Sequence, residues 1–157
     1  MHRFQLRGID PEPFRSLFDR SEAELREHGA VRRIATESPG FPCRVSLEDA
    51  EVGEVLLLVS YRHLPVASPY RAIGPVFVRR GAKPRVLAVG EVPPYVTRRL
   101  ISLRAYDAAD MMVAATVCEG AAVASEIERH FGDAAVAHLQ LHNAAQGCFS
   151  CQVDRVR

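Results

Sequence analysis

The sequence predicts a single domain of the α+β class, with a largely antiparallel or mixed sheet and a few short helices. Its length of 157 residues, 48% of them apolar and 25% charged, suits one domain with an independent core. The C-terminal half shows patterns in the order β-β-α-β-β, and short helical patterns precede them. These observations together indicate strands that pair as hairpins, rather than parallel strands joined by helical crossovers.

The N-terminal part predicts short elements whose boundaries are set by prolines and a helix cap. Prolines at 11 and 13 suit the first turn of a helix. Ser21 with Glu24 is a capping-box signature, and Gly29 is a typical helix end. The expected elements are a strand at 4–9, helices at 12–20 and 23–28, and a strand at 30–36.

The middle of the chain predicts one central strand between irregular segments. The segment "EVLLLVSY" (54–61) is apolar at successive positions, which is typical of a strand buried on both faces. Pro65 and Pro69 predict a long loop after it. The expected elements are a strand at 54–61, a loop at 63–74, a strand at 75–80, a mostly irregular stretch at 81–94 and a short helix near 95–100.

The C-terminal half predicts two hairpins separated by a helix. Val123, Ile127 and Phe131 recur every fourth residue, and Gly132 would end that helix. The expected elements are strands at 100–108 and 111–118, a helix at 120–132, and strands at 136–143 and 148–156. The segment 134–146 could instead form a helix, but alternation of apolar and polar residues favours a strand.

The last hairpin predicts a separation of polar and apolar side chains. If "NAAQG" is its loop, His142 lies opposite Cys148, and residues facing each other share one side of the sheet. The polar side would hold His138, Gln140, His142, Cys148, Ser150, Gln152 and Asp154. The apolar side would hold Leu139, Leu141, Phe149, Cys151 and Val153.

Cys148 and His142 are the candidate catalytic residues. A thiol beside an imidazole can act as a nucleophile with a neighbouring base. A structural zinc site is disfavoured, because Cys148 and Cys151 would point to opposite faces of a strand and no second Cys-x-x-Cys exists. If 134–146 formed a helix instead, His138 and His142 would lie on one face, and a zinc site would again be possible. We therefore expect no metal and no cofactor, and the sequence contains no nucleotide-binding motif.

Several polar residues are candidates for holding an anionic ligand. Tyr70 and Arg71 lie in the proline- and glycine-framed loop "SPYRAIGP", and Arg104 lies on the polar face of its strand. Arginine suits carboxylate and phosphate groups because its planar guanidinium can bind them in a bidentate manner. The expected ligand-binding residues are Arg44, Tyr70, Arg71, Arg104 and Asn143.

The charge and hydropathy of the chain exclude some classes of partner. A net charge of +1 provides no general attraction for nucleic acid or acidic membranes. No apolar run approaches the roughly 18 residues of a membrane span, and no signal peptide is recognisable. Cysteines of a cytoplasmic protein would be reduced, and we expect this location.

Four segments of the sequence resemble the bacterial family DUF1203, a domain of unknown function. They are "GFPCRVSLEDAEVGE", "SPYRAIGPVFVR", "LRAYDA" and "LHNAAQGCFSCQVDR". The resemblance covers nearly the whole chain and implies a bacterial, soluble, single-domain protein over 1–157. It implies no activity and supplies no catalytic residues.

Three hypotheses for function follow from these residues. The first is a domain that binds a small anionic molecule in a polar pocket. The second is an enzyme that uses Cys148 with His142 for nucleophilic or acid–base chemistry. The third is a structural or interaction domain without catalysis, which forms a homodimer through a sheet edge.

Overall fold

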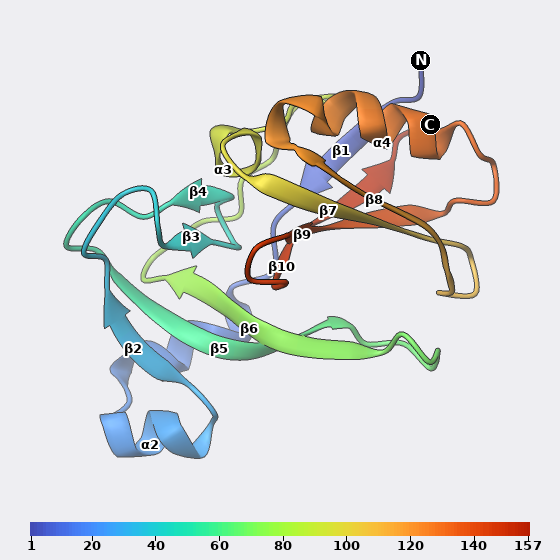
Figure 1. The fold of residues 1–157 in the computed structure, drawn as a ribbon. Coiled ribbons are helices and arrows are strands. Elements are labelled where there is room, and N and C mark those ends of the chain that lie inside the picture. Colours follow the sequence, from blue (N-terminus) through green and yellow to red (C-terminus); the bar gives the residue numbers. More distant parts are fainter.

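The computed structural model describes all residues 1–157 and contains two five-stranded sheets (Figure 1). In spatial order, the first sheet contains β1 (Phe4–Arg7), β10 (Phe149–Arg155), β9 (His138–Asn143), β7 (Leu100–Tyr106) and β8 (Met112–Glu119). The second contains β2 (Val31–Ile34), β5 (Val55–Leu64), β6 (Ala72–Arg79), β3 (Pro42–Cys43) and β4 (Glu48–Asp49). Only β3 and β6 pair in parallel, so the predicted α+β class with largely antiparallel strands is confirmed.

The helices are short and lie outside the two sheets. They are α1 (Glu12–Arg15), the 3-10 helix η1 (Ser16–Asp19), α2 (Glu22–Glu27), α3 (Pro94–Thr97), the 3-10 helix η2 (Gly120–Ala122) and α4 (Val123–Phe131). The predicted capping residue is confirmed, since the Ser21 hydroxyl accepts a hydrogen bond from the Glu24 amide at 3.2 Å. The longest helix, α4, has nine residues, and no helix could cross a bilayer.

Each sheet has its own apolar core. The first core lies between α4 and the first sheet, and α4 covers the face that points away from the second sheet (Figure 1). Ile127 and Phe131 of α4 pack there against Leu139 and Leu141 of β9. The second core joins Val59 and Val76 of the second sheet to Phe14, Phe18 and Leu25 from the N-terminal helices. Phe149 of the first sheet also belongs to this second core, so it ties the two sheets together.

The structure corrects the bounds of one predicted loop and decides between strand and helix at 134–146. The loop predicted at 63–74 is confirmed for 65–71 but is too long at both ends, because β5 continues to Leu64 and β6 begins at Ala72. The prolines at 65 and 69 bound the connection but do not end the strand early, and Tyr61 still pairs with Gly74. The strand favoured within 134–146 is confirmed by β9, and the helical alternative is wrong, because no residue of this segment is helical.

The register of the last hairpin differs from the predicted one. His142 lies opposite Phe149, not opposite Cys148, and Gln140 lies opposite Gln152. A bulge between Phe149 and Cys151 adds one residue to β10 and reverses the side to which Phe149 points. The predicted apolar side is otherwise confirmed, because its other four residues lie in the first core.

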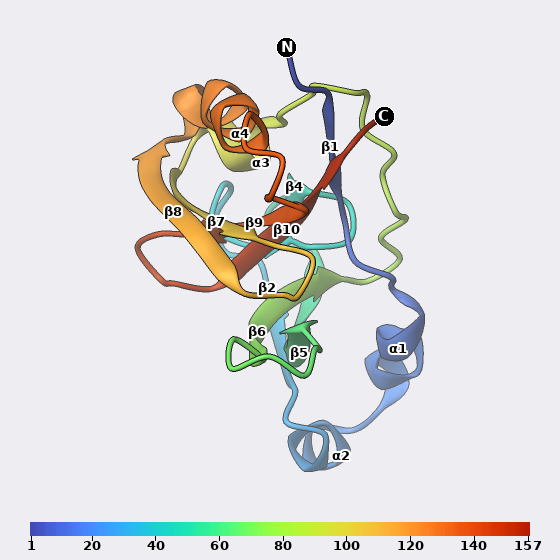
Figure 2. The same ribbon diagram turned by 90° about the vertical axis from the view of Figure 1, so that its right-hand side faces the viewer.

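The chain passes from the first sheet to the second through a close approach at Gly8. A Cβ atom on Gly8 would lie 2.2 Å from the main-chain oxygen of Val45, so only glycine fits there. The next amide, of Ile9, donates to the oxygen of Arg44 at 3.0 Å. Figure 2 shows β1 leading along the first sheet to α1 beside the second. The segment 7–10 therefore packs against the residues that connect β3 and β4.

Candidate functional site

A row of polar side chains on β9 and β7 of the first sheet contacts β5 of the second sheet. We call this contact region the seam. His138, Gln140 and His142 alternate along β9, so they share one face. On β7, Ser102, Arg104 and Tyr106 lie opposite them in register. Contacts of Gln140 and His142 with His63 of β5 show that this face points toward the second sheet. The predicted polar side of β9 is thus largely buried between the sheets.

Gln140 holds His63 through two hydrogen bonds across the seam. The Gln140 Nε2 donates to the main-chain oxygen of His63 at 2.6 Å, which fixes the orientation of the amide. The amide oxygen therefore faces His63 Nδ1 at 2.9 Å and must accept from it. His63 thus carries its proton on Nδ1, and its Nε2 makes no hydrogen bond within the protein. Burial lowers the pKa of His63, so the ring is neutral near pH 7.

His142 is the most deeply buried histidine of the seam. Its Nδ1 lies 3.2 Å from the oxygen of Gly147, and its Nε2 lies 3.3 Å from the amide oxygen of Gln140. Burial, assisted by the charge of Arg104, lowers the pKa of His142 to about 3. A neutral imidazole has one N–H, so only one of these two acceptors receives a hydrogen bond at neutral pH. His142 is therefore a packed, uncharged part of the seam.

A pocket of about 350 Å³ opens beside His63. Its polar lining consists of Arg7, Asp10, Tyr61, His63, Asp110, His138, Gln140 and Gln152. Phe149 forms part of the wall, and its ring stacks on His63 with centroids 5.3 Å apart. The volume lies at the lower end of the range for small-molecule sites, and polar groups converge on it from both sheets.

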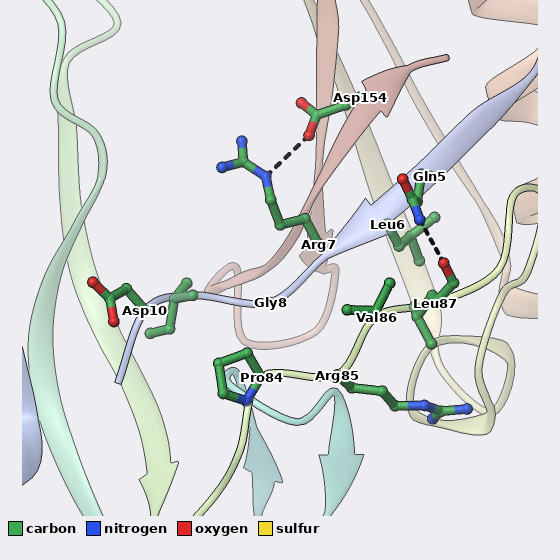
Figure 3. Close-up of a pocket in the computed structure, with 11 residues that line it drawn as sticks. Gln5, Leu6, Arg7, Gly8, Asp10, Pro84, Arg85, Val86, Leu87 and Asp154 are labelled. Atoms are coloured by element: carbon green, nitrogen blue, oxygen red, sulfur yellow. Dashed lines mark hydrogen bonds and ion pairs between the residues drawn. The ribbon is translucent and has the colours of Figure 1, made fainter. Parts of the chain in front are cut away.

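A larger cavity of about 440 Å³ lies on the other side of segment 7–10 (Figure 3). Its lining includes Leu6, Val86 and Leu87 and contains no histidine or cysteine. Gln5 donates to the oxygen of Leu87 at 2.6 Å, a bond that joins β1 to the segment opposite. We place the candidate site in the smaller pocket, because several ionisable side chains meet there and the larger cavity offers fewer polar groups.

Arg7 provides the positive charge of the smaller pocket. Its Nε donates to Asp154 at 3.0 Å, as Figure 3 shows, and its two Nη groups have no partner in the protein. The Arg7 side chain is 65% exposed, so a ligand can replace its water at small cost. The free guanidinium edge of Arg7 can bind an anion, and the unprotonated Nε2 of His63 can accept a hydrogen bond.

The structure does not bring the predicted ligand-binding residues into one pocket. Tyr70 packs edge-on against Tyr106 at 6.2 Å, next to Ser68, whose hydroxyl donates to the oxygen of Asp110 at 2.7 Å. Arg71 lies in a separate pocket with Arg62, outside the candidate site. Arg104 lies opposite Gln140 on β7, so it belongs to the seam.

Arg44 lies at the opposite end of the seam, beside Cys148. Arg44 is buried, with 2% exposure, and donates to the main-chain oxygens of Phe149 at 2.8 Å and Pro42 at 2.7 Å. Its Nη2 donates to Cys148 Sγ at 3.1 Å. Asn143 Nδ2 lies 4.0 Å from the same sulfur. We call Arg44, Asn143 and Cys148 the thiol site.

The predicted pairing of Cys148 with His142 across the hairpin is wrong, because the bulge places Phe149 opposite His142. No hydrogen bond joins the Cys148 thiol to the His142 ring; Arg44 contacts the sulfur instead. A catalytic role for Cys148 and His142 stays a prediction. Cys151 packs in the first core, where burial raises its pKa to about 12. No group of three or more His, Cys, Asp or Glu side chains is arranged to hold a metal ion.

His63 and Arg7 are the site residues that sequence reasoning missed. The sequence predicts a loop at His63 because Pro65 follows it, yet the polar residues Tyr61 and His63 continue strand β5. Arg7 ends the short N-terminal strand and shows no local signal of function. Its position beside β10 arises from pairing with a segment almost the whole chain away.

Comparison with known proteins identifies a family but no activity. No curated protein matches the chain, and no solved structure matches it. Residues 40–155 match the family model described as "Protein of unknown function (DUF1203)". That match includes β5, the last hairpin and both Arg44 and Cys148, but it leaves out Arg7. The chain therefore belongs to the DUF1203 family.

Proposed function

We propose that this protein binds a small anionic molecule in the pocket between Arg7 and His63. The observation that carries the proposal is the pair of hydrogen bonds by which Gln140 fixes His63 as a neutral acceptor. A ligand with a carboxylate or phosphate for Arg7 and a hydroxyl hydrogen for His63 Nε2 would satisfy both groups. The proposal keeps the anionic ligand that the sequence suggested and moves its main contacts to Arg7 and His63.

Calorimetric titration with matched ligands tests the proposal. Glycolate and acetate differ by one hydroxyl, and inorganic phosphate supplies a second class of anion. We expect glycolate to bind more tightly than acetate, because only glycolate can donate to His63. Arg7→Gln should abolish binding of all three, and His63→Phe should remove the preference for glycolate.

Arg62→Gln is the matched control for this titration, because Arg62 is exposed and lies outside the pocket. It should leave binding unchanged. At a hundred times its Kd, a ligand stabilises the folded state by about 2.7 kcal/mol, so thermal unfolding gives an independent readout. Binding that survives Arg7→Gln, or that Arg62→Gln weakens equally, would disprove the proposal.

A second candidate function is self-association through β8. This strand lies at an edge of the first sheet, and its segment 112–118 carries no charged residue. Val113 and Val117 are 46% and 59% exposed. An antiparallel pair of β8 strands centred on Ala115 would bring Val113 of one copy opposite Val117 of the other. Val117→Lys should convert such a dimer to a monomer in size-exclusion chromatography; a monomeric wild type at high concentration would rule it out.

The proposal includes a reducing bacterial cytoplasm as the protein's location. All four cysteines are free thiols, which supports such a compartment. Fractionation of a bacterium that expresses the tagged chain would test the location, and recovery outside the cytoplasm would contradict it.

A further inference from the structure

The thiol site contains a buried positive charge without a carboxylate partner. Arg44 is almost completely excluded from water, and no salt bridge includes it. Its two main-chain acceptors are neutral. Buried charges in proteins are normally paired, because an unpaired charge is costly to remove from water. The one ionisable group that hydrogen-bonds to Arg44 is the thiol of Cys148.

Arg99 shows the usual arrangement in the same protein. Its guanidinium contacts both carboxylate oxygens of Asp49, at 3.0 and 2.5 Å, and the Asp49 side chain is 3% exposed. Arg98 adds a third contact to this carboxylate at 3.0 Å. Where the fold needs a structural ion pair, it therefore supplies a carboxylate. At Arg44 the equivalent place is taken by sulfur.

Asn143 provides a second, independent observation at the thiol site. The side chain is buried, with 4% exposure for the residue, and its Nδ2 approaches Cys148 Sγ. Its Oδ1 is buried and has no hydrogen-bond partner. A buried acceptor without a partner destabilises the folded state. A donor attached to the sulfur would satisfy it.

Cys148 differs from the other cysteines in access and surroundings. It is partly exposed, whereas Cys43 and Cys151 are buried. Cys118 is also partly exposed, but burial raises its pKa, with smaller contributions from nearby Glu126 and Glu119. Only Cys148 combines access to solvent with a hydrogen bond from a cation. Reactive cysteines occur in surroundings of this type.

We propose that Cys148 is a reactive thiol that hydroperoxides oxidise to a sulfenic acid, with Arg44 stabilising the negative sulfur. The sulfur attacks the terminal oxygen of the hydroperoxide, so an S–O bond forms while the O–O bond breaks. Hydroxide or an alkoxide leaves, the sulfur is oxidised by two electrons and the peroxide is reduced. The new sulfenic hydroxyl can donate to Asn143 Oδ1, the acceptor that lacks a partner. This inference does not depend on ligand binding in the pocket.

Thiol labelling of the intact protein tests the first part of the proposal. Iodoacetamide near pH 7, followed by peptide mass spectrometry, should modify Cys148 at least about tenfold faster than Cys118 in the same sample. Hydrogen peroxide with dimedone should then give an adduct on the Cys148 peptide that is absent from Cys118. Equal labelling of the two cysteines, or no dimedone adduct on Cys148, would overturn the proposal.

A pair of variants tests whether the surroundings cause this reactivity. Asn143→Asp replaces the side-chain amide with a carboxylate beside the Cys148 sulfur. Like-charge repulsion should then slow both the labelling by iodoacetamide and the oxidation by hydrogen peroxide about tenfold. Gln146→Glu makes the same chemical change at an exposed residue of the adjoining turn and should have little effect. The wild-type comparison with Cys118 remains decisive if Asn143→Asp fails to fold. An equal effect of both variants would contradict the role of the buried site.

Discussion

Arg7 and Arg44 lie at opposite ends of the seam and show how solvation decides what an arginine can do. The Arg7 side chain is 65% exposed and uses only its Nε within the protein. Arg44 is 2% exposed, and the hydrogen bonds of its guanidinium go to two oxygens and one sulfur. Arg7 can exchange water for a ligand, whereas Arg44 can act only on the atoms already around it. The pocket is therefore suited to binding a ligand, and the thiol site is suited to changing the reactivity of the Cys148 sulfur.

Replacement of Arg44 should lower the free energy of unfolding much more than replacement of Arg7. Arg44→Met removes the donor to two buried carbonyl oxygens, so we expect the free energy of unfolding to fall by about 1–3 kcal/mol for each oxygen. Arg7→Gln should change it by less than about 0.5 kcal/mol, because the lost ion pair is exposed. Urea unfolding of both variants measures the difference. Similar losses at both positions would contradict the comparison.

The buried histidine between the two ends should make stability depend on pH. In the folded protein the pKa of His142 is about 3, against a usual value of 6.5. Between these values the unfolded chain binds a proton that the folded protein does not. The free energy of unfolding should therefore fall as pH drops below 6.5, by up to about 1.4 kcal/mol per pH unit.

Urea unfolding between about pH 4 and pH 7 measures this slope. His63, His130 and His138 have pKa values lowered by burial and act in the same direction. His142→Gln should remove the largest share of the slope, because Gln cannot titrate. An unchanged slope in that variant would show that His142 is not the buried neutral group described.

Gln140 and Gln152 provide the sharpest test within the pocket. They are cross-strand partners, but only Gln140 holds His63. Gln140→Leu should weaken glycolate binding about tenfold and destabilise the fold by about 2 kcal/mol, since His63 loses its partner. Gln152→Leu, whose side chain bonds only to Asp154 at 3.3 Å, should change both quantities much less. If the two variants weakened glycolate binding equally in calorimetry, the hydrogen bonds from Gln140 to His63 would not explain the affinity.

The smallest effect is expected at the loop residue that the sequence suggested as an anion contact. Arg71 is exposed and lies outside the pocket. Arg71→Gln should leave both the affinity for glycolate and the midpoint of thermal unfolding nearly unchanged, within about 0.5 kcal/mol. A clear loss of glycolate binding in this variant would show that the anion binds at the loop 65–71 and not in the pocket.

Local patterns predicted most strands, but not the contacts between the two sheets. The period-two alternation of Leu139 and Leu141 identified their buried face correctly, because one face of that strand is covered by α4. The side to which Phe149 points depends on a bulge, and no local pattern marks it. The burial of Arg44 depends on the oxygen of Phe149, more than a hundred residues away. The sequence therefore identifies all three residues of the thiol site as candidates, but not the contacts that bring them together, and it does not identify Arg7 and His63 as pocket residues.

Nitrogen NMR of the histidine rings tests the central claim most directly. Near pH 7, the His63 ring should appear as the neutral tautomer with its proton on Nδ1, as the contact with Gln140 requires. Addition of glycolate should shift the His63 Nε2 resonance and leave the exposed rings of His2 and His28 unchanged. A His63 ring that is charged, protonated on Nε2 or insensitive to glycolate would contradict the account.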